Sequence, residues 1–223
     1  MRRFLILKLQ GPMQAWGDHT YEDYRPTMGF PSRSGLLGLL GACLGIRRED
    51  EQGQRGLSRS LRFAVRADGE LHRLTDFHTV LNARKVGGRV NEDPVVSLRE
   101  YLVPASAGAG FTVAVWETDF AEVTLSQLVQ AIRRPVFTPS LGRRSCPLAR
   151  PLYQAEVEAI DAVAALAQVP PVGGTIYSEE GSLELPQLRV RDVPVITRPR
   201  QFEIRRIYVH KHRSGDAHVP EQS

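Results

Sequence analysis

The sequence has 223 residues, of which 42% are hydrophobic and 24% are charged. These are ordinary values for a globular protein, and they exclude a disordered or fibrous chain. Lysine and arginine number 29 against 25 acidic residues, so the formal net charge is +4. Two cysteines are too few for the disulfide framework of a secreted protein. No stretch reaches the roughly 20 apolar residues that a membrane span needs, and we expect a cytoplasmic protein that does not contact a membrane.

Positive charge is concentrated in two stretches. Residues 123–155 carry five arginines and no acid, and residues 198–213 carry six basic residues against one acid. Between them, residues 156–188 hold six acids and no lysine or arginine. This segregation is typical of a protein with one surface facing an anion, although a charge run is more often a solvated face. We expect the acidic stretch to face a neighbouring protein.

Apolar periodicity predicts strands in the first half of the chain at residues 4–9, 61–66 and 74–81, the last two as neighbours in one sheet. Ser32 or Ser34 is placed to cap a helix that continues to about Ile46. Residues 47–60 are polar and are expected to form a second, weaker helical turn or a loop.

A polar and basic segment, residues 82–99, follows these strands. Its basic side chains include Arg84, Lys85 and Arg99, and a Gly-Gly pair provides a turn. We expect this segment to form a hairpin that protrudes from the body as an arm.

Two helices and further strands are expected in the second half of the chain. Thr124 caps one helix with Gln127 at the capping-box position, and residues 161–168 form the other. Strands are predicted at residues 111–115, 136–138, 188–190 and 204–209.

The predicted order of elements is strand–helix–strand–strand–helix–strand, followed by more strands. This order predicts an α+β fold, a ferredoxin-like antiparallel sheet with helices on one face. We expect a single domain over residues 1–213, with the arm at about 82–100 and a flexible tail at 214–223.

The predicted helix after Arg33 contains four glycines between residues 35 and 45. Each glycine costs a helix about 1 kcal/mol relative to alanine, so close packing against another backbone is expected to offset the loss. That packing is one interpretation. The other is functional, because free N–H groups at a helix start, beside an arginine, can hold a phosphate.

A second candidate phosphate site is the loop at Gly142, where Arg143 and Arg144 follow a hinge glycine; a solvated loop is the alternative. Cys146 is disfavoured as a nucleophile because no histidine stands at a motif spacing to activate it, and Cys43 is interpreted as a core residue. No cluster has metal-ligand spacing, so we expect no metal and no cofactor.

Aromatic residues near the first strand have two interpretations. Trp16, Tyr21, Tyr24 and Phe30 could stack on unpaired RNA bases, or they could pack in the core.

Seven sequence blocks carry a family resemblance: LQGPMQAWG at residues 9–17, RPT at 25–27, FPSRSGLLGLLGACLG at 30–45, DFHTVL at 76–81, REYL at 99–102, LGRRSCP at 141–147 and PVGGTIYSEE at 171–180. Together they strongly resemble the CasD family, the CRISPR-associated proteins of the RAMP superfamily that are subunits of the type I-E Cascade complex. The resemblance runs from residue 1 to about residue 209.

This resemblance implies a ferredoxin-like (RRM-like, RAMP-type) body with a β-hairpin thumb and extra C-terminal strands. It implies a non-catalytic subunit of an antiviral ribonucleoprotein surveillance complex. Such a subunit binds and caps the 5′ handle of the CRISPR RNA (crRNA) and links the CasC backbone to the large CasA subunit. Target DNA is reached only through the complex. The thumb maps onto the predicted arm.

Residue candidates follow from the resemblance and the charge pattern together, since arginines neutralise phosphates while base contacts hold an unpaired strand. For the handle they are Gln14, Arg25, Arg33, Ser34, Arg143 and Arg144. For the thumb they are Arg84, Lys85 and Arg99. The alternative function is a metal-independent endoribonuclease that processes CRISPR repeat RNA, because CasD-like chains in a related subtype cut it themselves. His78 with Tyr101 or Lys85 are its candidate participants.

Overall fold

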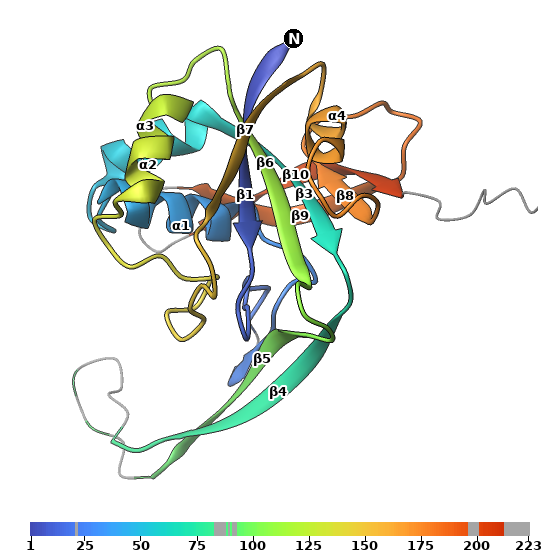
Figure 1. Ribbon diagram of the computed structural model, residues 1–223. Helices are drawn as coiled ribbons and strands as arrows, with labels where there is room; N and C mark the ends of the chain where they lie inside the picture. The colour runs from blue at the N-terminus through green and yellow to red at the C-terminus, as the bar shows by residue number, and fades with distance from the viewer. Residues whose placement is uncertain (21, 83–87, 89, 91–92, 196–200, 212–223) are drawn as a thin grey trace, which may run out of the picture.

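The computed structural model describes residues 1–20, 22–82, 88, 90, 93–195 and 201–211 (Figure 1). Their fold is α+β and is dominated by one large antiparallel sheet. Its strands are β1 (Arg2–Leu9), β3 (Leu61–Asp68), β6 (Gly110–Glu117), β7 (Tyr153–Ala159), β8 (Thr175–Ser178), β9 (Gln187–Val195) and β10 (Gln201–Lys211). They lie in the order β7-β1-β6-β3-β8-β10-β9.

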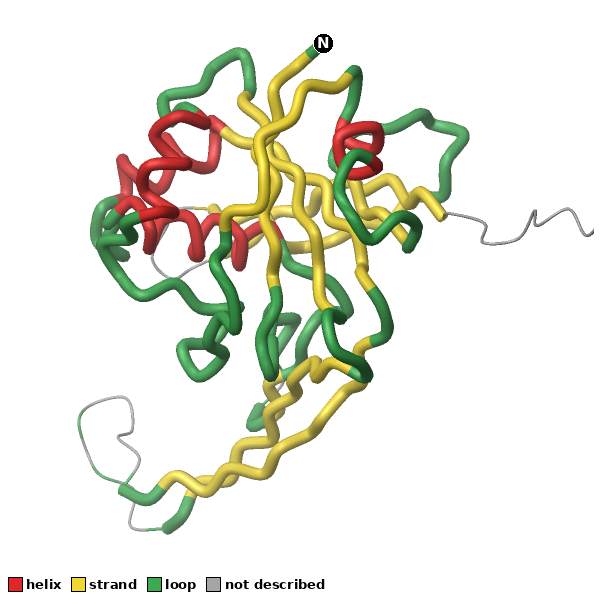
Figure 2. The backbone as a smooth tube through the Cα atoms, viewed as in Figure 1, coloured by secondary structure: helices red, strands yellow, loops and turns green. Residues whose placement is uncertain are grey.

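Helices cover both faces of the large sheet (Figures 1 and 2). Side chains alternate between the faces along a strand, so Leu5 and Leu7 of β1 face one core while Phe4 and Ile6 face the other. The helices on the first face are α1 (Arg33–Leu44), α2 (Glu51–Ser60) and α3 (Leu125–Arg133). The second face is covered by α4 (Ala162–Ala167). The prediction that all helices lie on one face is therefore wrong, because the alanines of α4 bury a second, smaller core.

Local sequence signals set the helix N-termini as predicted. Ser32 caps α1, its side chain accepting from the Gly35 N–H, and Gly45 ends the helix in the left-handed conformation with φ 78°. At α3 both hydrogen bonds of the Thr124–Gln127 capping box are present.

Two strand predictions are corrected by the structure. The predicted strand at residues 136–138 is absent, and the N–H groups of Val136 and Phe137 instead donate to the Cys43 and Ala42 carbonyls at the end of α1. The strand predicted at residues 74–81 exists but does not pair with β3. Both edges of β3 are taken by the more apolar β6 and by β8.

A long hairpin projects from the body (Figures 1 and 2). It pairs β4 (Leu71–Val80) with β5 (Val95–Pro104), and the short β2 (Tyr24–Arg25) runs parallel to β5. The predicted arm at 82–100 therefore covers the connection and part of the returning strand, while β4 forms the other side of the arm.

Candidate nucleic-acid interface

A groove of about 1110 Å³ lies between α1 and the loop that follows α3. Its walls include three of the predicted handle residues, Ser34, Arg143 and Arg144. Arg47 and Arg48 also line it. These four arginines face a single lining carboxylate, Glu49, so the charged side chains of the groove sum to +3 (four positive minus one negative). The fold thus places the positive charge of two separate sequence segments around one groove.

The rim at Gly142 requires a glycine. The residue has φ +86°, and an added Cβ would lie 1.7 Å from the carbonyl oxygen of Ala15. A side chain would therefore be strained both by the backbone angle and by the contact. The absence of a side chain lets the 142–144 turn lie against the segment that follows β1, where the Ala15 N–H donates to the Leu141 carbonyl at 3.0 Å.

Arg143 joins three segments of the chain. Its guanidinium donates to the Glu100 carbonyl at 2.8 Å and to the Arg25 carbonyl at 2.7 Å, and it lies 4.9 Å from the ring centre of Tyr101. The hydrogen-bonding partners are neutral carbonyls, so these bonds leave the positive charge of Arg143 uncompensated. Arg144, next in the chain, is exposed. The pair therefore serves two purposes, one anchoring the loop and one facing solvent.

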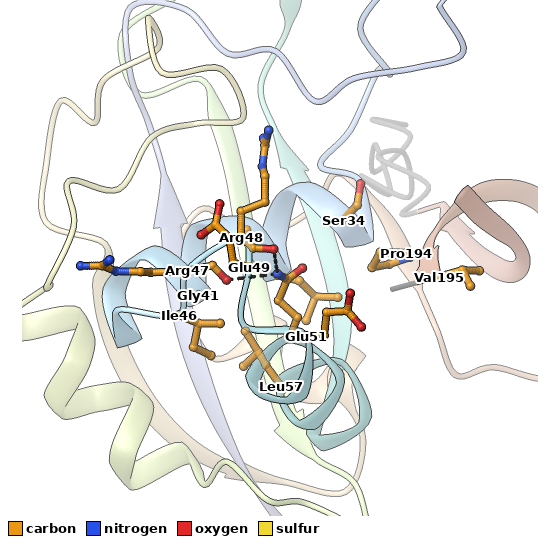
Figure 3. A pocket seen from close by; sticks show the side chains of 13 residues that line it. Ser34, Gly41, Ile46, Arg47, Arg48, Glu49, Glu51, Leu57, Pro194 and Val195 are labelled. Carbon is orange, nitrogen blue, oxygen red and sulfur yellow. Dashed lines mark hydrogen bonds between the residues drawn. The ribbon is translucent and has the colours of Figure 1, made fainter. Parts of the chain in front are cut away.

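Arg47 and Arg48 were not selected from the sequence, although two adjacent arginines had marked residues 143 and 144. Their backbone carbonyls accept hydrogen bonds from Gln54 Nε2 of α2, at 3.1 Å and 2.8 Å. Figure 3 looks into a smaller hollow of about 550 Å³ that shares Ser34 and both arginines with the groove, and it shows the two side chains extending away from Leu57 of α2. Both arginines are exposed.

Gln14 is fully buried and does not line the groove. Its Nε2 donates to the Leu9 carbonyl at 3.0 Å, and its Oε1 accepts from Trp16 Nε1 at 3.0 Å. Trp16 is 2% exposed, and Phe30 is buried and stacked on Tyr177 at 4.2 Å. Core packing is thus the observed role of both rings, while Tyr21 lies outside the described residues.

Arg33 is the candidate whose surroundings differ most from expectation. Its side chain is 4% exposed and donates to Glu179 Oε1 at 2.7 Å, and to the Ser58 and Leu61 carbonyls at 2.6 Å and 3.0 Å. Its backbone N–H donates to Asp192 Oδ2 at 2.6 Å. Burial lowers the pKa of the guanidinium, and the charge of Glu179 opposes that effect. The carboxylate of Asp192 therefore occupies the N-terminus of α1, where a phosphate site was one of the two interpretations of the sequence.

Three of the six acids in the acidic stretch pair with arginines of the same chain. Glu179 is 7% exposed and pairs with Arg33 and Arg205, Glu180 pairs with Arg2, and Glu156 pairs with Arg3. The interpretation of this stretch as a protein-facing surface is not needed to explain these three carboxylates.

The base of the arm is organised around Glu100. Its carboxylate accepts from the Tyr24 hydroxyl, from the Thr27 N–H at 3.0 Å and from Arg73 at 2.6 Å. Burial alone would raise the pKa of Glu100, but these hydrogen bonds and the charge of Arg73 outweigh it and lower the pKa.

The predicted thumb residues fall partly in this region. Arg25 and Arg99 are register partners in β2 and β5, and Arg25 is exposed while Arg99 is half-buried. Arg84 and Lys85 lie outside the described residues.

His78 and Tyr101, two of the three candidates for the alternative nuclease, are not brought together. Tyr101 is opposite Leu74 in the hairpin, and His78 is four residues further along β4, about 13 Å away at the usual rise of a strand. Tyr101 is also buried beneath Arg143, whereas His78 contacts Asp76. Lys85 lies outside the described residues.

Neither cysteine is placed as a nucleophile. Cys43 and Cys146 are buried, and burial raises the pKa of Cys43 to about 11 and also raises that of Cys146. Within the described ranges no group of three histidine, cysteine or acidic side chains could hold a metal ion, and no helix there is long and apolar enough to cross a membrane.

The chain is 50% identical to the CRISPR system Cascade subunit CasD of Escherichia coli strain K12, over 95% of this chain and 97% of that protein. A chain of a CRISPR RNA-guided surveillance complex superposes with a TM-score of 0.73 at 27% identity, covering 93% of this chain and 89% of that one. A crystallised Cas protein gives a TM-score of 0.59 at 27% identity, covering 93% and 92%.

A family model described as CRISPR-associated protein (Cas_Cas5) matches residues 4–208. That span is most of the chain, and the Cascade relative matches over nearly all of it. The chain therefore belongs to the Cas5 family of CRISPR-associated proteins.

Proposed function

We propose that this chain is a non-catalytic subunit of a Cascade-type complex and holds the 5′ handle of CRISPR RNA in the groove between α1 and the 142–144 turn. The observation that carries the proposal is the convergence of Arg47, Arg48, Arg143 and Arg144 on that groove. A cluster of guanidinium groups with one carboxylate among them suits a chain of phosphates. The relative named as a Cascade subunit supports the same reading.

The proposed residues divide into two roles. Arg47, Arg48 and Arg144 are exposed and neutralise phosphates, with Ser34 as a hydrogen-bonding neighbour in the same groove. Gln14 and Arg33 act as positioning residues, because their polar atoms already have partners inside the protein.

The arm is proposed to act as the thumb. Arg25 and Arg99 at its base, with Arg84 and Lys85, would contact the RNA where it leaves the groove. The β4–β5 hairpin projects beyond the body, so that neighbouring subunits can contact both the hairpin and the body (Figure 1). We propose the CasC backbone and the large CasA subunit as these neighbours.

We also infer that residues 1–213 form one domain built on a ferredoxin-like unit. Its first strand, β1, lies between its last two strands, β6 and β7, and β3 pairs with β6, with α1 and α3 packed on one face. The arm is then an insertion between β3 and β6, and β8, β9 and β10 extend the sheet.

The groove is tested with the full chain and its handle RNA. Arg47→Ala, Arg48→Ala and Arg144→Ala are each expected to weaken binding and to flatten the dependence of log K on log salt by about 0.7 to 1. Arg134→Ala is the control, since Arg134 is exposed at the end of α3 and does not line the groove. Equal affinities and slopes for all four variants would contradict the groove as the RNA site.

Catalysis is tested separately with repeat RNA incubated without metal. We expect the RNA to stay intact, because His78 and Tyr101 are too far apart to act on one phosphodiester. Site-specific scission by the wild-type chain that His78→Ala abolishes would overturn the non-catalytic assignment.

A further inference from the structure

A second basic pocket, of about 620 Å³, lies where the end of α2, the β6–α3 loop and the β9–β10 hairpin meet. No described residue lines both this pocket and the RNA groove. Its rim carries three solvent-accessible arginines, Arg59, Arg62 and Arg206, and one large aromatic side chain, Phe120. None of these residues has a role in the function proposed above.

The floor of the pocket carries no net charge of its own. Glu179 bonds to Arg33 and Arg205, and Arg205 also binds Asp192 through two hydrogen bonds of 2.6 Å and 2.8 Å. Two arginines therefore balance two carboxylates below the rim. Arg62 lies 3.7 Å from Glu179, a loose contact for a side chain that is 50% exposed.

The charge available to a ligand is thus that of the rim. Arg59, Arg62 and Arg206 contribute three positive charges and Glu122 one negative charge, which leaves +2. Guanidinium groups bind phosphate oxygens through paired N–H donors, and they are also weakly hydrated cations that stack on flat rings.

Phe120 is 82% exposed, an unfavourable setting for an aromatic ring, yet its loop is firmly held. The Thr118 N–H donates to the Ser60 carbonyl at 2.8 Å, and the Thr118 hydroxyl donates to the Arg59 carbonyl at 2.7 Å. The Glu122 N–H donates to Ser60 Oγ at 2.8 Å. These hydrogen bonds fix the loop, so the Phe120 ring is held in solvent beside the arginines.

We propose that this pocket is a second site for single-stranded nucleic acid, in which the rim arginines hold a phosphate and Phe120 stacks on a base. Stacking on an exposed ring beside cationic side chains is how proteins hold unpaired strands without reading their sequence. An acidic peptide would satisfy the charge but would leave the face of the ring without a flat partner. It would also find the backbone N–H groups of residues 118 and 122 already bonded within the protein. The observations therefore favour a nucleic acid over a protein segment.

The test uses the full chain and a fluorescein-labelled ten-nucleotide oligodeoxythymidylate, with affinity measured by anisotropy between about 50 and 200 mM salt. Arg59→Ala and Arg206→Ala should each flatten the salt dependence by about 0.7 to 1 in slope, whereas Arg134→Ala should not. Phe120→Ala should weaken binding about fivefold or more with an unchanged slope. Ile160→Ala, which removes another exposed apolar side chain at 71% exposure, is its control.

Groove variants distinguish this site from the proposed handle site. If Arg47→Ala and Arg48→Ala weaken binding of the oligonucleotide while the pocket variants match their controls, the second site does not exist. Loss of a partner protein from the complex, without loss of oligonucleotide binding, would assign the pocket to that protein and would also overturn the proposal. Failure of the groove variants alone leaves the pocket result intact and counts only against the handle site.

Discussion

The Arg33→Met variant tests whether Arg33 stabilises the fold or binds a phosphate of the RNA. Methionine fills a similar volume without a charge or a donor. In the native protein the guanidinium supplies one ion pair to Glu179 and two hydrogen bonds to carbonyls of α2 and β3, all from a side chain that is 4% exposed. No water can easily replace those donors at that depth.

The expected loss of stability follows from the acceptors left behind. Each buried carbonyl without a donor costs about 1–3 kcal/mol. Removal of one member of a buried ion pair costs about 3–5 kcal/mol, but Glu179 keeps Arg205 at 3.1 Å, so this cost is reduced. The two carbonyls together account for about 2–6 kcal/mol and the weakened ion pair adds to this, so we expect the free energy of unfolding to fall by about 3 kcal/mol or more.

Urea unfolding followed by circular dichroism measures that decrease, and Arg62→Met, at a residue that also contacts Glu179 but is half exposed, is the control. Arg62→Met should cost less than about 1 kcal/mol. At a temperature where both variants are folded, Arg33→Met should leave the salt slope of RNA binding unchanged. A stability within 1 kcal/mol of wild type, or a slope flattened by about one, would refute the internal role of Arg33.

Three further predictions concern the rim, the arm and a helix cap. Gly142→Ala should lower the free energy of unfolding by about 2 kcal/mol or more and weaken RNA binding, because the new Cβ meets the Ala15 carbonyl at a positive φ; unchanged urea midpoint and RNA affinity would contradict the rim geometry. The pKa of Glu100 is lowered in the folded state, so its stabilising contribution is present above the ordinary carboxyl pKa and is lost as pH falls through the folded value. Amide hydrogen exchange in β5 should therefore differ between wild type and Glu100→Gln at pH 6, and the two should converge only in acid, at a pH below the ordinary carboxyl pKa of about 4.3; a difference that persists at the lowest pH where both are folded would count against it. Thr124→Ala should cost about 1 kcal/mol by loss of the capping box, measured by urea unfolding, with Ser126→Ala as an exposed control on the same helix; equal midpoints would exclude the cap as a stabilising contact.

Features that depend on a few neighbouring residues were predictable from the sequence. The Thr124–Gln127 box and the Ser32 cap needed only residues within one helical turn. Strand β7 was not predicted, although Tyr153, Ala155 and Val157 alternate with polar residues in the pattern of a half-buried strand.

Features that depend on distant partners were not predictable. The pairing of β4 with β5 instead of β3 is decided by which strands cover the edges of β3, and one of them, β8, begins more than 100 residues later. The partners of Arg33 likewise lie 146 and 159 residues further along the chain. The local sequence shows that an arginine is present, but it does not show which hydrogen-bond acceptor the fold places beside it.

The acceptor is what decides how an arginine of this chain can act. The side chains of Arg33, Arg66 and Arg205 are buried or nearly so, and each forms an ion pair with a carboxylate of the protein. Their charges are therefore neutralised internally. Arg143 bonds to carbonyls and keeps its charge, and Arg144 is exposed. Counting the 29 basic residues therefore overstates the capacity for phosphate, since counterion release depends only on charges that an incoming strand can reach. The salt slope of RNA binding should accordingly track the exposed arginines of the groove and be insensitive to the buried ones.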